Sequence, residues 1–101
     1  MVELNWTNEA KYWLRYIYEY IAQYDVNAAQ KVIDGICQKV ELLAIFPDIG
    51  YKYENPSIDN IRILVYGHYR IAYLAVNKTR IDILAIIHGR MDINKYFENL
   101  K

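Results

Sequence analysis

The sequence predicts an α+β fold, in which a short strand and two amphipathic helices precede an antiparallel sheet. Apolar residues recur at helical spacing in the first half of the chain, and they form three short strand-like segments in the second half. Brief polar turns separate those three segments. At 101 residues the chain has the length of one domain, so we expect residues 1–101 to form a single unit with one core.

The first predicted element is a short strand that leads directly into a helix. Val2, Leu4 and Trp6 alternate with polar residues, which is typical of a half-buried strand. Thr7 then offers a side-chain oxygen that can cap a helix. A helix is expected from about residue 8 to residue 24, because apolar residues recur there at helical spacing (Ala10, Trp13, Leu14, Ile17 and Ile21).

A second helix is predicted after a break at residues 25–27. Asn27, with Gln30 three residues later, resembles a capping box. One helical face is then apolar (Ala29, Val32, Ile33, Ile36, Val40 and Leu43). Pro47 cannot continue the helix, and the short connection between the helices predicts an antiparallel hairpin. Gly35 costs the helix about 1 kcal/mol relative to alanine, which close approach of the first helix would explain, as would chance.

The second half of the chain predicts a loop followed by three strands. Residues 51–60 contain an Asn-Pro-Ser segment and are expected to form the loop. The strands are expected at residues 61–66, 69–76 and 81–88, and their short connections make neighbouring strands antiparallel. Gly67-His68 suits a two-residue hairpin turn, whereas residues 77–80 are expected to form a longer polar turn.

The last of these strands is apolar on both of its faces. Simple alternation places Ile81, Ile83 and Ile87 on one face and Leu84 and Ile86 on the other. We therefore expect this strand to lie at the centre of the sheet and to be covered on both sides. Residues 92–100 are expected to form a short helix or tail, with Asp92 as its cap and an apolar side (Met91, Ile93, Tyr96 and Phe97).

Composition and charge argue against several functional classes. Twelve Lys and Arg balance twelve Asp and Glu, whereas a protein that grips nucleic-acid phosphates normally carries a basic excess. The single cysteine, Cys37, permits no disulfide within the chain and suggests no metal cluster. The N-terminus lacks a signal-peptide pattern, and no apolar run has the length of a membrane span. We expect a cytoplasmic protein with no cofactor, no metal and no membrane contact.

Tyrosine is unusually frequent, with eleven residues in the chain. Four of them are spaced by four residues on the first predicted helix and form a stripe along it (Tyr12, Tyr16, Tyr20 and Tyr24). Tyrosine is enriched at protein interfaces, so the stripe is a candidate contact surface for a partner. The alternative is that some of these rings only cover the edge of the core.

Several segments, in this order and spacing, resemble the ParE/RelE toxin superfamily over nearly the whole chain. They are Trp6 with Ala10, Tyr20-Ile21-Ala22, Leu43 with Pro47 and Gly50, Arg62, Tyr69 to Tyr73, and Ile87-His88-Gly89-Arg90-Met91-Asp92. The resemblance implies a helical hairpin packed on a curved antiparallel sheet. It also implies a toxin that is held silent by a cognate ParD- or RelB-like antitoxin encoded next to it, and we place that antitoxin on the tyrosine stripe.

Members of this superfamily have two different targets. ParE-like toxins poison DNA gyrase without a known nuclease centre, whereas RelE-like toxins cut mRNA in the ribosomal A site. The closing His-Gly-Arg-Met-Asp segment and the neutral charge favour the ParE-like alternative. A third hypothesis is a degenerate toxin domain that only binds its antitoxin.

A RelE-like ribonuclease needs an acid, a base and cations that bind the phosphate. Arg62, His88 and Arg90 are the candidates, because the predicted strands could bring them together, although spacing indicates no acid–base partner for His88. In the alternative interpretation, which we favour, His88 is a strand-end histidine that bonds to backbone. The arginines would then form ion pairs with aspartates (Asp59, Asp82 or Asp92), and His68 would be solvated in its turn.

Overall fold

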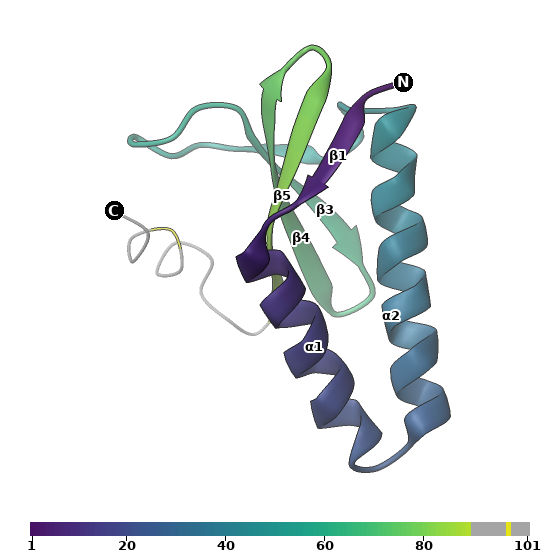
Figure 1. Cartoon of the computed structure of the whole chain (residues 1–101). Helices are drawn as coiled ribbons and strands as arrows, with labels where there is room; N and C mark the ends of the chain where they lie inside the picture. The colour runs from purple at the N-terminus through teal and green to yellow at the C-terminus, as the bar shows by residue number, and fades with distance from the viewer. Residues whose placement is uncertain (90–96, 98–101) are drawn as a thin grey trace.

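One strand, two helices and four further strands follow one another along the chain (Figure 1). The computed structural model describes residues 1–89 and residue 97. The elements are β1 (Glu3–Trp6), α1 (Asn8–Ala22), α2 (Val26–Glu41), the 3-10 helix η1 (Leu42–Ala44), β2 (Tyr51–Tyr53), β3 (Ile61–Tyr66), β4 (Tyr69–Asn77) and β5 (Arg80–His88). The predicted α+β class is confirmed, whereas the predicted C-terminal helix or tail lies outside the described residues, Phe97 excepted.

The five strands form one sheet in the order β1-β5-β4-β3-β2. β1 runs parallel to β5, and every other neighbouring pair is antiparallel, as the short turns predict. β5 is an interior strand, as its apolar faces predict, although β4 occupies the centre of the sheet. No helix in the described part of the chain is long and apolar enough to cross a membrane.

Two of the predicted connections are wrong in detail. The segment 51–60, expected to be a loop, begins with β2, which pairs with β3 through three residues. Such a short edge strand is defined by its neighbour rather than by its own pattern, so local propensity misses it. The turn after β4 is shorter than expected, because Asn77 pairs with Arg80 and leaves only Lys78 and Thr79 between the strands.

Side-chain caps set the beginnings of both helices. The Thr7 hydroxyl accepts a hydrogen bond from the Ala10 amide at 3.2 Å, which confirms the predicted cap of α1. The same hydroxyl donates to the Ile83 carbonyl at 2.7 Å and so ties α1 to β5. The capping box predicted at Asn27 is wrong, because Asp25 caps α2 two residues earlier by accepting from the Ala28 amide at 3.1 Å.

The two helices lie side by side against one face of the sheet (Figure 1). A core cluster fills the space between the helices and the sheet. Its buried members come from α1, α2, η1 and the three long strands (Ala10, Ile17, Ile36, Val40, Leu43, Leu64, Ile71, Tyr73, Ile81, Ile83 and Ile86). The opposite face carries a smaller cluster in which Ile61, Ile63 and Ala72 are buried with Phe97. Both faces of the sheet are therefore covered, as the apolar pattern of β5 predicts.

The packing of Gly35 has a different cause from the one expected. The nearest atoms belong to Tyr66 of β3, not to α1: a methyl group at Gly35 would lie 1.8 Å from the Tyr66 hydroxyl oxygen. The glycine therefore makes room for an aromatic ring from the sheet. Glycine lowers the helix propensity of α2, but its lack of a side chain allows α2 to pack closely on β3.

Candidate functional site

An apolar groove opens between α1 and the end of the sheet where β4 begins and β5 ends. It has a volume of about 380 Å³, and its walls are largely aromatic (Trp13, Tyr16, Ile17, Tyr20, Ile21, Tyr69, Ile86 and His88). We call this cavity the tyrosine groove. Apolar concave surfaces with a few polar groups are the usual form of binding sites, so the groove is the first candidate.

The tyrosine stripe borders this groove and is exposed along its whole length. Tyr12, Tyr16, Tyr20 and Tyr24 are 60%, 52%, 57% and 79% exposed, so none of them belongs to the buried core. Their rings contact one another: Tyr12 stacks on Tyr16 with centroids 6.5 Å apart, and Tyr20 meets Tyr24 edge-on at 6.1 Å. Such exposure suits a contact surface, and the binding role of the stripe stays a prediction.

Two polar groups of the groove have an unusual environment. The indole nitrogen of Trp13 is buried and has no hydrogen-bond partner among the described residues. Its ring is held edge-on against Tyr12 and Tyr16, at centroid distances of 5.6 and 5.8 Å. Burial raises the pKa of the Tyr69 hydroxyl, and Tyr20 adds to the shift. The groove therefore holds a neutral hydroxyl and an apolar surface at its centre.

His88 closes the groove and has a neighbour that the sequence did not reveal. Its ring lies edge-on to Tyr69 at 5.6 Å and stacks on His68 with centroids 6.1 Å apart and planes 17° from parallel. His68 is exposed, as expected, but the β3–β4 hairpin brings it to the end of β5. The Gly89 amide, which donates to the His68 carbonyl at 2.6 Å, ties the two segments together.

The histidine pair belongs to a second, smaller cavity of about 250 Å³, which we call the basic pocket. Its lining combines both histidines with Arg70 and with small or apolar residues (Val65, Gly67, His68, Arg70, His88 and Gly89). Arg70 donates a hydrogen bond to the Tyr51 hydroxyl at 3.3 Å. His88 lines both cavities, so the tyrosine groove and the basic pocket meet at this residue.

Arg62 does not join His88 as the ribonuclease hypothesis expects. Arg62 pairs with Tyr73 and His88 pairs with Tyr69, so the two lie four residues apart along β4. This separation is roughly 13 Å along the strands at about 3.3 Å per residue, and β4 lies between β3 and β5, the two strands that carry these residues. The hairpin register thus overturns the expected convergence, and Arg90 lies outside the described residues.

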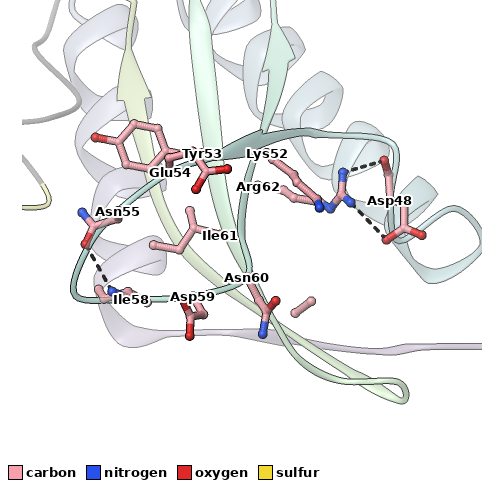
Figure 2. Close-up of a pocket in the computed structure, with 11 residues that line it drawn as sticks. Asp48, Lys52, Tyr53, Glu54, Asn55, Ile58, Asp59, Asn60, Ile61 and Arg62 are labelled. Atoms are coloured by element: carbon pink, nitrogen blue, oxygen red, sulfur yellow. Dashed lines mark hydrogen bonds and ion pairs between the residues drawn. The ribbon is translucent and has the colours of Figure 1, made fainter.

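Arg62 instead binds the loop that follows η1. Its guanidinium donates to the Gly50 carbonyl at 2.7 Å and to the Asp48 carbonyl at 3.2 Å, and it forms an ion pair with the Asp48 carboxylate at 3.7 Å (Figure 2). The predicted structural role is therefore right in kind, although Asp48 replaces the expected partners. Asp82, one of those partners, pairs with Arg80 at 2.9 Å.

A polar cavity surrounds this arginine. It has a volume of about 460 Å³ and contains residues of both charges (Asp48, Lys52, Tyr53, Glu54, Asn55, Ile58, Asp59, Asn60, Ile61, Arg62 and Ala75; Figure 2). Asn55 there accepts from the Ile58 amide and so holds its own loop. Within the described part of the chain, no three side chains of the metal-binding types come together. The cavity offers mixed charge without a defined ligand geometry, so the groove is the stronger candidate.

Comparison with known proteins gives one family and one fold. The family model described as ParE toxin of type II toxin-antitoxin system, parDE, matches residues 4–93. A chain from the chromosomal ParDE TA system of P. aeruginosa has a TM-score of 0.70 at 24% sequence identity, and the match covers 87% of this chain and 96% of that chain. The curated proteins contain no match. The solved structure supports the same fold, and the family match spans most of the chain.

Proposed function

The chain belongs to the ParE toxin family of type II toxin–antitoxin systems, and from this premise we propose that it arrests bacterial growth by binding DNA gyrase. We further propose that a cognate antitoxin silences it by covering the tyrosine stripe and the tyrosine groove. The family match over residues 4–93 is the observation that carries the first proposal. The second is carried by the exposed aromatic surface of α1.

The stripe and groove have the features of a protein-binding surface. The four tyrosines of the stripe are more than half exposed, three of them on α1 and Tyr24 just beyond its end. Beside them a cavity of about 380 Å³ is lined by tryptophan, tyrosine and isoleucine. Tyr and Trp supply large contact area at low cost in conformational entropy, and they dominate binding energy at many interfaces. An antitoxin segment that lies along α1 would bury this exposed aromatic surface.

The contacts of Arg62 and the net charge of the chain fit a binding mechanism better than a nuclease mechanism. Arg62 is engaged by two backbone carbonyls and a carboxylate, and it lies far from His88 along the sheet. Formal net charge is +0, which gives the whole chain little attraction for RNA phosphates. Gyrase poisoning requires no proton transfer by the toxin, so it does not need these residues to meet.

One observation favours the ribonuclease as the second candidate. His68 supplies an imidazole beside His88, and two imidazoles can serve as the acid and the base of a phosphodiester transfer. Arg70, which lines the same pocket, would replace Arg62 as the cation. The two functions therefore differ in what they demand of His88.

Expression of the chain without its antitoxin tests the proposed function. We expect growth arrest, inhibition of gyrase supercoiling by the purified protein, and largely intact toxicity in the variant His88→Ala. A ribonuclease that loses its general acid or base would slow by about 10² to 10⁴. Cleavage of ribosome-bound mRNA that His88→Ala abolishes would establish the second candidate instead. Normal growth of cells that contain soluble, folded protein would leave only the third hypothesis, a degenerate toxin domain that binds its antitoxin and has no toxicity.

Charge placed on the stripe tests the antitoxin surface. Tyr16→Glu and Tyr20→Glu should each weaken the antitoxin complex by about tenfold or more, because a buried unpaired carboxylate costs several kcal/mol. Ile45→Glu is the matched control, since Ile45 is 61% exposed on the loop after η1. Titration calorimetry gives the affinity, and circular dichroism verifies that each variant is folded. Unchanged affinity in both tyrosine variants would make the stripe a purely structural feature.

A further inference from the structure

The tyrosine groove and the basic pocket are two parts of one candidate site, and they meet at His88 at the end of the sheet. His88 lines both cavities, and its ring contacts Tyr69 on the groove side and His68 on the pocket side. Largely apolar and aromatic residues line the first part, whereas Arg70, His68 and His88 are among the residues that line the second. Arg70 follows Tyr69 on β4 and pairs with Ile87, so its side chain belongs to the opposite face of the sheet, and the two parts meet around the end of the sheet. A ligand that occupies both parts must therefore be apolar along most of its length and polar at one end.

The sign of the charge at that end follows from the lining residues. No carboxylate lines either cavity in the described part of the chain. Arg70 forms no ion pair with a described residue, and its one hydrogen bond, to the Tyr51 hydroxyl, leaves other N–H donors of the guanidinium available. A guanidinium that has no ion-pair partner among the described residues attracts an anion.

We propose that the antitoxin segment in the groove carries apolar side chains followed by an aspartate or glutamate whose carboxylate enters the basic pocket. This inference rests on the proposed function, because it assigns the chemistry of the partner that covers the groove. The guanidinium of Arg70 binds the carboxylate, and the exposed His68 lines the same pocket. The carboxylate thereby fixes the direction in which the segment lies along α1.

A protein carboxylate fits this site better than a phosphate of nucleic acid does. Nucleic acid is bound through rows of Lys and Arg that follow its backbone, whereas this pocket contains one arginine and opens into an apolar groove. A volume of about 250 Å³ suits a single side chain rather than a polymer backbone. The apolar part would also contribute most of the affinity for a peptide segment, through burial of its side chains.

Small probes test the pocket without any antitoxin. Acetate titrated into the ¹⁵N-labelled protein should shift the NMR signals of the His68 and His88 rings and of the Arg70 guanidinium in a saturable way. Acetamide, which has the same size and no charge, should leave these signals in place. The response to acetate should disappear in Arg70→Gln. Equal shifts with acetate and acetamide, or none with acetate, would overturn the assignment of a carboxylate site.

The antitoxin complex tests the pocket in its biological setting. Arg70→Glu should weaken binding by roughly tenfold and Arg70→Gln by about fivefold, as expected for one partly exposed ion pair. Lys78→Glu changes the charge by the same amount at the other end of β4 and should leave the affinity unchanged. Wild-type affinity should fall with added salt, and this dependence should be smaller in Arg70→Gln.

The outcomes separate this inference from the function on which it rests. If the wild type arrests growth and binds its antitoxin but folded Arg70 variants bind equally well, the carboxylate assignment is wrong and the toxin assignment stands. If the wild type binds no antitoxin at all, the proposed function itself fails. Binding of single-stranded RNA that depends on Arg70, His68 and His88 would overturn the inference in favour of a nucleic-acid site.

Discussion

The hydroxyl of Tyr73 offers the sharpest test of how the loop beyond η1 is held. Tyr73 is fully buried in the centre of β4, and its hydroxyl donates to the Pro47 carbonyl at 2.8 Å and accepts from the Gly50 amide at 3.0 Å. Burial raises the pKa of this hydroxyl, so it remains a neutral donor and acceptor. The variant Tyr73→Phe removes one atom and leaves the Gly50 amide and the Pro47 carbonyl without this partner.

The expected loss follows from the burial of those two groups. A buried donor or acceptor without its partner costs about 1–3 kcal/mol. The Gly50 amide is fully buried and takes the upper part of this range, whereas the bond to Pro47 is only partly buried. We expect unfolding free energy to fall by about 2–3 kcal/mol. For a chain of this length that corresponds to a decrease in melting temperature of roughly 10 °C or more.

Thermal and urea unfolding, followed by circular dichroism, measure the effect of Tyr73→Phe. Tyr24→Phe is the matched control, because Tyr24 is 79% exposed and loss of its hydroxyl should change stability by less than about 0.5 kcal/mol. If Tyr73→Phe also remains within about 0.5 kcal/mol of the wild type, the loop is not held by this hydroxyl. Tyr73 would then not fix the position of Gly50, the residue whose carbonyl also accepts from Arg62.

Two further predictions concern close packing and pH. Gly35→Ala should destabilise the protein by about 1–2 kcal/mol despite its better helix propensity, because the new methyl group would lie 2.2 Å from the Tyr66 ring carbon Cζ. Urea unfolding measures the change in stability, and the second substitution Tyr66→Leu should recover part of the loss. A Gly35→Ala variant that is more stable than the wild type would contradict this prediction. Burial raises the pKa of Cys37 above its ordinary 9.0 and those of Tyr69 and Tyr73 above 10.0, so the folded chain keeps protons that the unfolded chain releases. Stability should therefore be complete below pH 9.0 and decline as pH rises from there through the raised values, and a flat profile of unfolding free energy up to about pH 11 would refute this.

The elements with strong local signals could be predicted from sequence. The cap at Thr7, the helical spacing of α1 and α2, and the hairpin turn at Gly67 each depend on residues close together in the chain. Gly67 has a φ of 57°, the left-handed conformation that such a turn requires. β2 could not be predicted, because its three residues become a strand only through pairing with β3.

The placement of the candidate site residues was predictable only where they follow one helix. The tyrosine stripe follows from spacing by four residues: Tyr12, Tyr16 and Tyr20 lie on α1, and Tyr24 follows its end at Ala22. All four are exposed, as a contact surface requires. The neighbours of His88 come from a different hairpin, so no local pattern reveals that His68 stacks on it. The position of Arg62 likewise depends on the register between three strands, which the sequence does not specify beyond the alternation of faces.

A single irregularity of β5 explains why His88 reaches the groove. Tyr73 pairs with Ile83 and Ala72 with Ala85, so Leu84 is an extra residue in the ladder, that is, a β-bulge.

Simple alternation places Ile83 and Ile86 on opposite faces of β5, yet both belong to the cluster beneath the helices, while Leu84 packs on the other face. The predicted face assignment of Ile86 is therefore wrong beyond the bulge, because one extra residue reverses every later side chain. His88, two residues after Ile86, follows it to the helix side and lines the groove with Tyr69. Without the bulge, the same strand would turn His88 to the opposite face and leave the groove without its polar end. The irregularity in the sheet thus creates the junction between the apolar surface of α1 and the basic pocket.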